Sequence, residues 1–170
     1  MQMLTTRRAL LALALVLLAV LSGCGFRLRG EAQTHMPFKT IFLGLPATST
    51  LAIELKRNIR AVGGAEVVAD PKLADAILQV MQPERQDIIA IATVAGQPVE
   101  YRLYYKFAFR VKDNKDQELL PTASFSLYRD VDFSAAQALA MQSEDQLLYK
   151  DMQADLVQQI LRRLAAIKMP

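Results

Sequence analysis

The chain contains one cysteine, Cys24, and its position makes it the first candidate for chemistry. It follows an N-terminal segment whose only charges are Arg7 and Arg8 and which continues into the apolar run ALLALALVLLAVL. A basic start, an apolar run and a small-residue exit form the pattern of a secretory signal peptide. The run is shorter than the roughly 20 residues that a membrane-spanning helix needs. The pattern therefore predicts that residues 1–23 are removed.

The residues before Cys24 predict how its thiol is modified. Leu-Ser-Gly precedes it directly, which resembles the lipobox of bacterial lipoproteins, whose cysteine receives a diacylglycerol. A free cysteine buried in a core is the alternative, but burial does not explain a position at the exit of a signal peptide. We expect a diacylglycerol and an N-acyl chain on Cys24, which together hold a membrane stably, and no other cofactor. Gly25 follows, where inner-membrane lipoproteins often carry Asp, so the sorting rule points to the outer membrane.

Cleavage before Cys24 changes the bulk properties of the chain. It leaves 147 of the 170 residues, a length that suits one domain. The full chain has 20 basic and 17 acidic residues, and two of the basic ones leave with the signal peptide. The remaining charge is close to neutral, and the chain has no clustered basic run. Neither property favours a nucleic-acid partner. We predict a signal peptide over 1–23, a lipidated leader over 24–37 and a single domain over 38–170.

The other titratable side chains do not form a recognisable catalytic motif. His35 is the only histidine, so it cannot form a histidine pair on a metal, and its place in the leader predicts a solvated loop residue. General acid–base catalysis uses paired acids, but Asp130 with Asp132 is explained by a turn, and Glu144 with Asp145 by a solvated helix face. No Gly-x-Ser-x-Gly elbow, phosphate loop or zinc-binding helix motif occurs. We predict no enzyme, no catalytic residue and no metal site; a site assembled from scattered residues is the remaining alternative.

Hydrophobic periodicity predicts the elements of the domain. A strand over 39–45 is followed by a helix with caps at 48–50, a stop at Gly63-Gly64, and apolar residues at helical spacing. Short strands follow over 65–69, 76–81 and 88–94, with Pro83 as an interruption. A long amphipathic helix covers 134–167. The apolar stripes of the two helices are Leu51, Leu55, Ile59 and Val62 in the first, and Leu148, Met152, Leu156, Val157, Ile160, Leu161 and Leu164 in the second.

The segment VEYRLYYKFAFRVK alternates between apolar and polar residues over its whole length. Alternate residues of a strand face opposite sides, so this strand should have one core face and one wet face. A further strand at 123–128 alternates in the same way. With one face to cover, the sheet needs both helices on the same side. The predicted fold is α+β, with two helices packed on one face of a mainly antiparallel four- to five-stranded sheet.

The wet face of this sheet carries the one pattern that suggests binding. If the turn centres on residues 96–97, Ala92 pairs with Tyr101 and Ala90 with Leu103. Ile89 and Ile91 then share a face with Arg102, Tyr104 and Lys106. Apolar residues beside Arg and Lys suit a ligand with phosphates on an acyl body. A solvated strand face with a few stray aliphatic residues is the alternative.

Three segments carry a resemblance to a known family. The first is CGFRLRG at 24–30, the second is GQPVEY with the aromatic strand after it, and the third is YRDVDFSAAQALAMQSED before the last helix. Together with the order of elements they resemble the LptE family of lipopolysaccharide-assembly lipoproteins over essentially the whole mature chain. The resemblance implies an outer-membrane, periplasm-facing lipoprotein that plugs the LptD β-barrel in a 1:1 complex and binds lipopolysaccharide. Another outer-membrane lipoprotein, acting as a scaffold or periplasmic chaperone, is the alternative.

The sequence departs from the family where ligand contacts are concerned. Basic residues of the family just before the hairpin glycine and near the start of the last helix fall here near Val94 and Met141. We therefore take Arg85, Arg102 and Lys106 as the candidate phosphate contacts.

Overall fold

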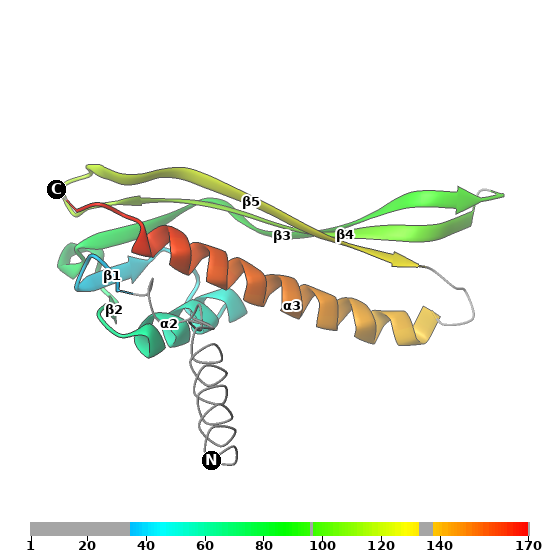
Figure 1. The fold of residues 1–170 in the computed structure, drawn as a ribbon, viewed down its shortest axis with the longest axis horizontal. Coiled ribbons are helices and arrows are strands. Elements are labelled where there is room, and N and C mark those ends of the chain that lie inside the picture. The colour runs from blue at the N-terminus through cyan, green and yellow to red at the C-terminus, as the bar shows by residue number, and fades with distance from the viewer. Residues whose placement is uncertain (1–34, 96, 133–137, 170) are drawn as a thin grey trace, which may run out of the picture. The chain divides into compact units, whose positions relative to one another are not determined.

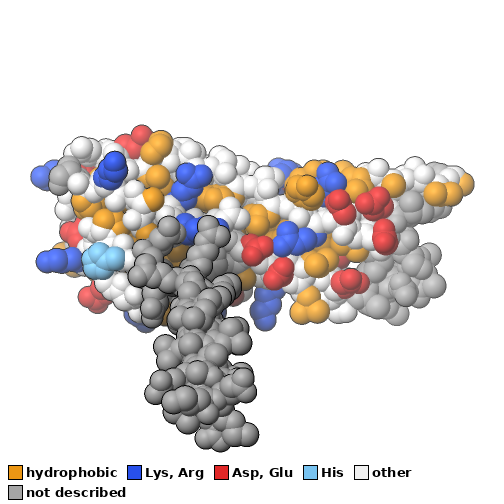
Figure 2. Space-filling view, in the orientation of Figure 1, with side chains coloured by type: hydrophobic (Ala, Val, Ile, Leu, Met, Phe, Trp, Pro, Cys, Tyr) orange, Lys and Arg blue, Asp and Glu red, His pale blue; other side chains and the backbone are white. Residues whose placement is uncertain are grey.

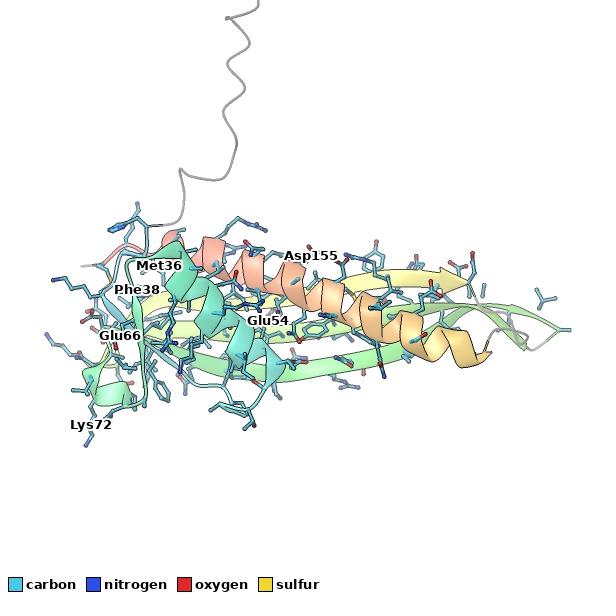
Figure 3. All side chains as sticks on the ribbon, turned by 90° about the horizontal axis from the view of Figure 1, so that it is seen from below. Met36, Phe38, Glu54, Glu66, Lys72 and Asp155 are labelled. Carbon is cyan, nitrogen blue, oxygen red and sulfur yellow. The ribbon has the colours of Figure 1, made fainter. Side chains whose placement is uncertain are left out.

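The computed structural model describes residues 35–95, 97–132 and 138–169. The sheet has the strand order β2-β1-β3-β4-β5, in which β1 runs parallel to both neighbours and the last three strands form an antiparallel meander. Both α-helices lie on the same face of this sheet (Figures 1 and 3), which confirms the predicted fold class. In chain order the elements are β1 (Thr40–Leu43), α2 (Thr50–Val62), β2 (Glu66–Val68), the 3-10 helix η1 (Pro71–Leu73), β3 (Ala76–Val94), β4 (Gln97–Lys112), β5 (Glu118–Asp132) and α3 (Ala138–Ala165).

Helix α2 begins and ends where its sequence predicts. The Ser49 side chain accepts a hydrogen bond from the Ala52 amide at 3.2 Å, which satisfies one of the free donors of the first turn. Leu51, Leu55 and Ile59 are fully buried on one face. Gly63 ends the helix with φ of +73°, a conformation that residues with a Cβ rarely adopt.

The core lies between the inner face of the sheet and the two helices. Strand β4 contributes Tyr105, Phe107 and Phe109, and Phe109 stacks on Phe125 of β5 with ring centroids 5.9 Å apart. The predicted α3 stripe is buried from Met152 to Leu164. Met36 and Phe38 are also buried, so the core includes a residue of the predicted leader, whereas His35 is exposed as expected.

A few polar contacts join the layers. The buried amide oxygen of Gln153 on α3 accepts from the Thr50 hydroxyl at 2.9 Å and from the Tyr105 hydroxyl at 3.3 Å. Desolvation within the core raises the pKa of Tyr105. Outside the core, Arg129 of β5 contacts Asp155 of α3 at 2.8 Å, and basic and acidic side chains are intermingled on this face (Figure 2). These contacts fix the middle of α3 against α2, β4 and β5.

Strand β3 corrects the prediction that Pro83 divides it. It runs without interruption from Ala76 to Val94, with register shifts on both sides of Pro83. Strand β1 pairs with β3 only as far as Leu78, so among the described residues the second edge of β3 is unpaired beyond that point. A proline, which lacks an N–H, is tolerated at a bulge on such an edge.

The β3–β4 hairpin also corrects the predicted register. Ala90 pairs with Tyr101 rather than Leu103, and Ala92 with Glu100 rather than Tyr101. The pairing continues to Val94 and Gln97, so the turn lies one position earlier than predicted. At Ala90 the shift is two residues, which leaves Ile89 and Ala90 on their predicted faces because strand side chains alternate with period two. At Ala92, beyond the bulge that separates it from Ala90, the shift is one residue, so Ala92 lies on the face of Glu100 and not on the predicted face of Tyr101.

Candidate functional site: the outer face of the long strands

The register of β3, β4 and β5 places three rows of side chains on the sheet face opposite the helices. Residues paired across neighbouring strands lie on the same face. The rows are Arg85–Lys106–Ser126, Asp87–Tyr104–Tyr128 and Ile89–Arg102–Asp130. All three basic residues predicted from the sequence are therefore on one face, and Arg85 and Lys106 are direct cross-strand neighbours.

Asp87 joins two of these basic residues. Its carboxylate accepts from Arg85 Nε at 2.7 Å and from Lys106 Nζ at 3.1 Å. The hydrogen bonds from Arg85 and then Lys106 lower the pKa of Asp87 below its ordinary value of 3.8. The Asp87 side chain is only 18% exposed while that of Arg85 is 68% exposed. The carboxylate is thus covered by cations that face solvent.

Arg102 makes a separate and more complete pair with Asp130. Its Nε and Nη2 atoms contact the two carboxylate oxygens at 2.5 and 2.8 Å, a bidentate arrangement that guanidinium geometry favours. The pair lowers the pKa of Asp130 and raises that of Arg102. The guanidinium also lies 4.5 Å from the ring centroid of Tyr128. Arg102 is consequently held in place by a carboxylate and an aromatic face.

Lys106 has a looser environment than Arg102. Its Nζ makes one contact with Asp87 and lies 4.8 Å from the ring centroid of Tyr104. Tyr104 and Tyr128 contact one another with centroids 6.2 Å apart. A flexible ammonium with one carboxylate partner can exchange that partner for a phosphate oxygen more readily than a bidentate guanidinium can. We name Arg85, Asp87, Arg102, Lys106 and Asp130 the outer-face cluster; it contains three cations and two carboxylates.

Exposed apolar residues adjoin the outer-face cluster towards the hairpin turn. Ile89 is the direct neighbour of Arg102 across the strands, and it is 47% exposed. Ile91 and Val94 are also exposed in this part of β3, whereas the exposed Ile88 pairs with Leu103 and lies on the opposite face. Cations beside apolar side chains can bind a molecule that has both anionic and hydrocarbon parts, as the sequence pattern predicts.

The carboxylates of the outer-face cluster were not recognisable from the sequence alone. Asp130 and Asp132 lie within β5, not in the predicted turn, and Asp130 is committed to Arg102. The only signal for Asp87 was its spacing of two from Arg85, which places both on one face once the strand is known to continue. Glu144 is exposed as expected, but its neighbour Asp145 is partly buried, and desolvation raises the Asp145 pKa.

Other predicted features lie outside or apart from this face. Cys24 and the predicted signal peptide lie outside the described residues. Among the residues described, no group of three or more His, Cys, Asp or Glu side chains is arranged to hold a metal ion. None of the described helices is both long and apolar enough to cross a bilayer.

Comparison with known proteins identifies the family. Residues 38–164 match the family model described as LptE, lipopolysaccharide-assembly. The chain belongs to the LptE family. It is thus a lipopolysaccharide-assembly lipoprotein, from a family that is non-catalytic and associated with the outer membrane.

Solved structures agree with this assignment to the LptE family. Lipoprotein B from Nitrosomonas europaea is 35% identical with a TM-score of 0.71, covering 84% of this chain and 91% of its own. A minor lipoprotein from Acinetobacter baumannii is 21% identical (TM-score 0.60; 79% and 99% covered) and shows the same fold. So does rare lipoprotein B from Shewanella oneidensis, at 20% identity (TM-score 0.63; 75% and 95% covered). A comparison with curated protein sequences gave no match.

Proposed function

We propose that this LptE-family protein sits in the lumen of the LptD β-barrel in a 1:1 complex. There it serves as plug and assembly factor and binds lipopolysaccharide during its insertion into the outer leaflet. The match to the LptE family over nearly the whole domain is the observation that carries this proposal. Large outer-membrane barrels have polar interiors that a folded plug can occupy. The exposed charged and tyrosine side chains of the outer face suit such a lumen, and a plug needs no catalytic group.

The outer-face cluster is the proposed contact for lipopolysaccharide phosphates. Arg85 and Lys106 share one carboxylate, so an arriving phosphate can take Lys106 while Asp87 keeps Arg85. Arg102 stays fixed by Asp130 and presents its remaining surface beside Ile89. The acyl part of the ligand would then lie over the exposed isoleucines. The proposed role is binding without a chemical step.

The proposed attachment is the acylated Cys24. Its diacylglycerol and N-acyl chain would hold the protein in the inner leaflet of the outer membrane, with the domain facing the periplasm and the barrel lumen. Two or more acyl chains give stable anchoring. We expect the Cys24→Ser variant to fold normally and to be released from membranes.

Co-purification tests the partner directly. A C-terminally tagged form is isolated from outer membranes in mild detergent, and the amount of LptD is measured. We expect LptD in equal amount and resistant to high-salt washing. Recovery of the lipoprotein alone, from membranes in which LptD is plentiful, would reject the plug and favour a scaffold or periplasmic chaperone.

A further inference from the structure

A groove on the flank of α2 has the chemistry of a lipid site, and it is separate from the outer-face cluster. It has a volume of about 910 Å³ and lies between α2, strands β1 and β2, and the loop that follows β1. Pockets of this size with mostly apolar linings commonly hold small ligands. Its apolar wall includes Phe42, Leu45, Ile53, Val67 and Val68. Ile53 is 54% exposed although it is a large aliphatic residue.

Three basic side chains of α2 line the same groove. Lys56, Arg57 and Arg60 follow Ile53 at spacings that keep them on one side of the helix, away from its buried stripe. All three are exposed. Within the described part of the chain, none of them has a carboxylate partner. An apolar groove with three unneutralised cations complements a molecule with an acyl chain and an anionic head group.

The position of the groove in the chain indicates which lipid it meets. The end of α2 is next to the start of the described chain, since a Cβ placed on Gly64 would lie 3.5 Å from Nδ1 of His35. Only ten residues separate Cys24 from His35. Even fully extended, they reach about 35 Å, at 3.3–3.6 Å per residue. An acylated Cys24 therefore keeps this end of the domain close to the leaflet that holds the anchor.

We propose that the α2 groove binds an anionic glycerophospholipid of the leaflet in which Cys24 is anchored. One acyl chain lies against the apolar wall, and the phosphate contacts Lys56, Arg57 and Arg60. This inference uses the anchor of the proposed function, but the quenching measurement that tests it requires neither LptD nor binding of lipopolysaccharide to the outer face. Basic residues attract anionic membrane lipids, so these three should give a clear preference for anionic over zwitterionic lipid.

Fluorescence quenching can test the site in the complete lipoprotein. Acylation occupies Cys24, so a cysteine introduced by Ala61→Cys at the groove can be labelled uniquely with bimane. The protein is placed in phosphatidylcholine vesicles in which a nitroxide-bearing chain is carried either by phosphatidylglycerol or by phosphatidylcholine. We expect half-maximal quenching at about a tenfold lower mole fraction of the phosphatidylglycerol probe. A label at Ala154→Cys, at an exposed position of α3 away from the groove and from the outer-face cluster, should show no such preference.

Charge variants decide whether the basic residues cause the preference. Lys56→Gln/Arg57→Gln/Arg60→Gln should remove it, while Arg162→Gln/Arg163→Gln/Lys168→Gln, which removes the same charge from the other helix, should leave it. Circular dichroism checks that both variants are folded. Equal quenching by the two probes, or a preference that survives the α2 substitutions, would overturn the proposal. Displacement of the probe by lipopolysaccharide but not by unlabelled phosphatidylglycerol would assign the groove to lipopolysaccharide instead and reject the phospholipid.

Discussion

The outer-face cluster and the α2 groove each present three basic side chains, but only those of the cluster are neutralised. Arg85 and Lys106 share Asp87, and Arg102 is held by Asp130. Lys56, Arg57 and Arg60 have no such partners among the described residues. An anion that binds the cluster must replace a carboxylate, whereas one that binds the groove replaces only water. The first surface suits a ligand that is exchanged, and the second suits steady contact with a membrane.

The ion pairs also show that the number of basic residues on a surface does not decide how readily the surface binds an anion. A count of positive charges ranks the two surfaces equally. The register of β3 against β4 makes Arg85 and Lys106 direct neighbours and puts Asp87 in the next row on the same face, where it contacts both. Charge availability is therefore a property of the fold.

The largest effect should come from the core that supports the outer face. Phe107 is fully buried on the opposite side of β4 from its neighbour Lys106. Phe107→Ala should lower the free energy of unfolding by about 3–5 kcal/mol, through lost apolar contacts and the cavity left behind. Ser126→Ala on the outer face should change it by less than about 0.5 kcal/mol. Urea denaturation measures both, and comparable values for the two would contradict the assigned inner and outer faces.

The second largest loss of stability is expected at the end of helix α2. Gly63 ends the helix at φ +73° and ψ 149°, and no atom lies near its added Cβ. Gly63→Ala should therefore destabilise the protein through backbone strain alone, by about 1–3 kcal/mol. Thermal unfolding measures the loss, with Ala61→Ser as the control. An unchanged midpoint for Gly63→Ala would mean that the end of α2 rearranges without cost.

A smaller effect, on lipopolysaccharide binding, is expected when two cations of the outer-face cluster lose their carboxylate partner. Asp87→Asn releases Lys106 and Arg85 from their shared carboxylate, so lipopolysaccharide binding should tighten by roughly tenfold, which corresponds to about 1.4 kcal/mol. Asp155→Asn, which alters the Arg129 pair between α3 and β5, is the control and should leave affinity unchanged. Surface plasmon resonance on the detergent-solubilised lipoprotein gives both constants. Weaker binding by Asp87→Asn would show that the carboxylate assists the ligand.

Lowering the pH should produce the smallest effect on stability. The pKa values of Asp87 and Asp130 are lower in the folded chain than the ordinary 3.8. Their contribution to stability is therefore present above pH 3.8 and is lost as the pH falls through the lowered values. Asp87→Asn/Asp130→Asn should flatten the dependence of the unfolding midpoint in this range. An equally steep dependence in the double variant would place the acid sensitivity elsewhere.

The sequence predicted the faces of the elements better than their partners. Period-two alternation in β4 correctly identified Tyr105, Phe107 and Phe109 as core, and helical spacing did the same for α3. Pairing depends on where the hairpin turns and on bulges, and alternation carries no information on either, so the register was wrong by two residues at Ala90 and by one at Ala92. The error changed the face of Ala92, beyond the bulge, but the three predicted basic residues do lie together.

The α2 groove lay beyond sequence reasoning for a different reason. Its wall combines a parallel strand pair, a helix flank and a loop that only the tertiary fold brings together. Lys56, Arg57 and Arg60 lie off the apolar stripe of the predicted helix, where charged residues are normally solvated. Asp87 is not recognisable from the sequence because Pro83 predicts an interruption of the strand, and the continuous β3 is what places Asp87 on the same face as Lys106.

The most direct test of the account is the affinity of the purified lipoprotein for lipopolysaccharide in two variants with opposite expectations. Arg85→Gln/Lys106→Gln should weaken binding by at least about tenfold, because charge-assisted hydrogen bonds contribute about 1.5–3 kcal/mol each. Lys56→Gln/Arg57→Gln/Arg60→Gln should stay within about twofold of the parent chain. Unchanged binding in the outer-face variant, or a greater loss in the α2 variant, would contradict the claim that the outer face binds lipopolysaccharide.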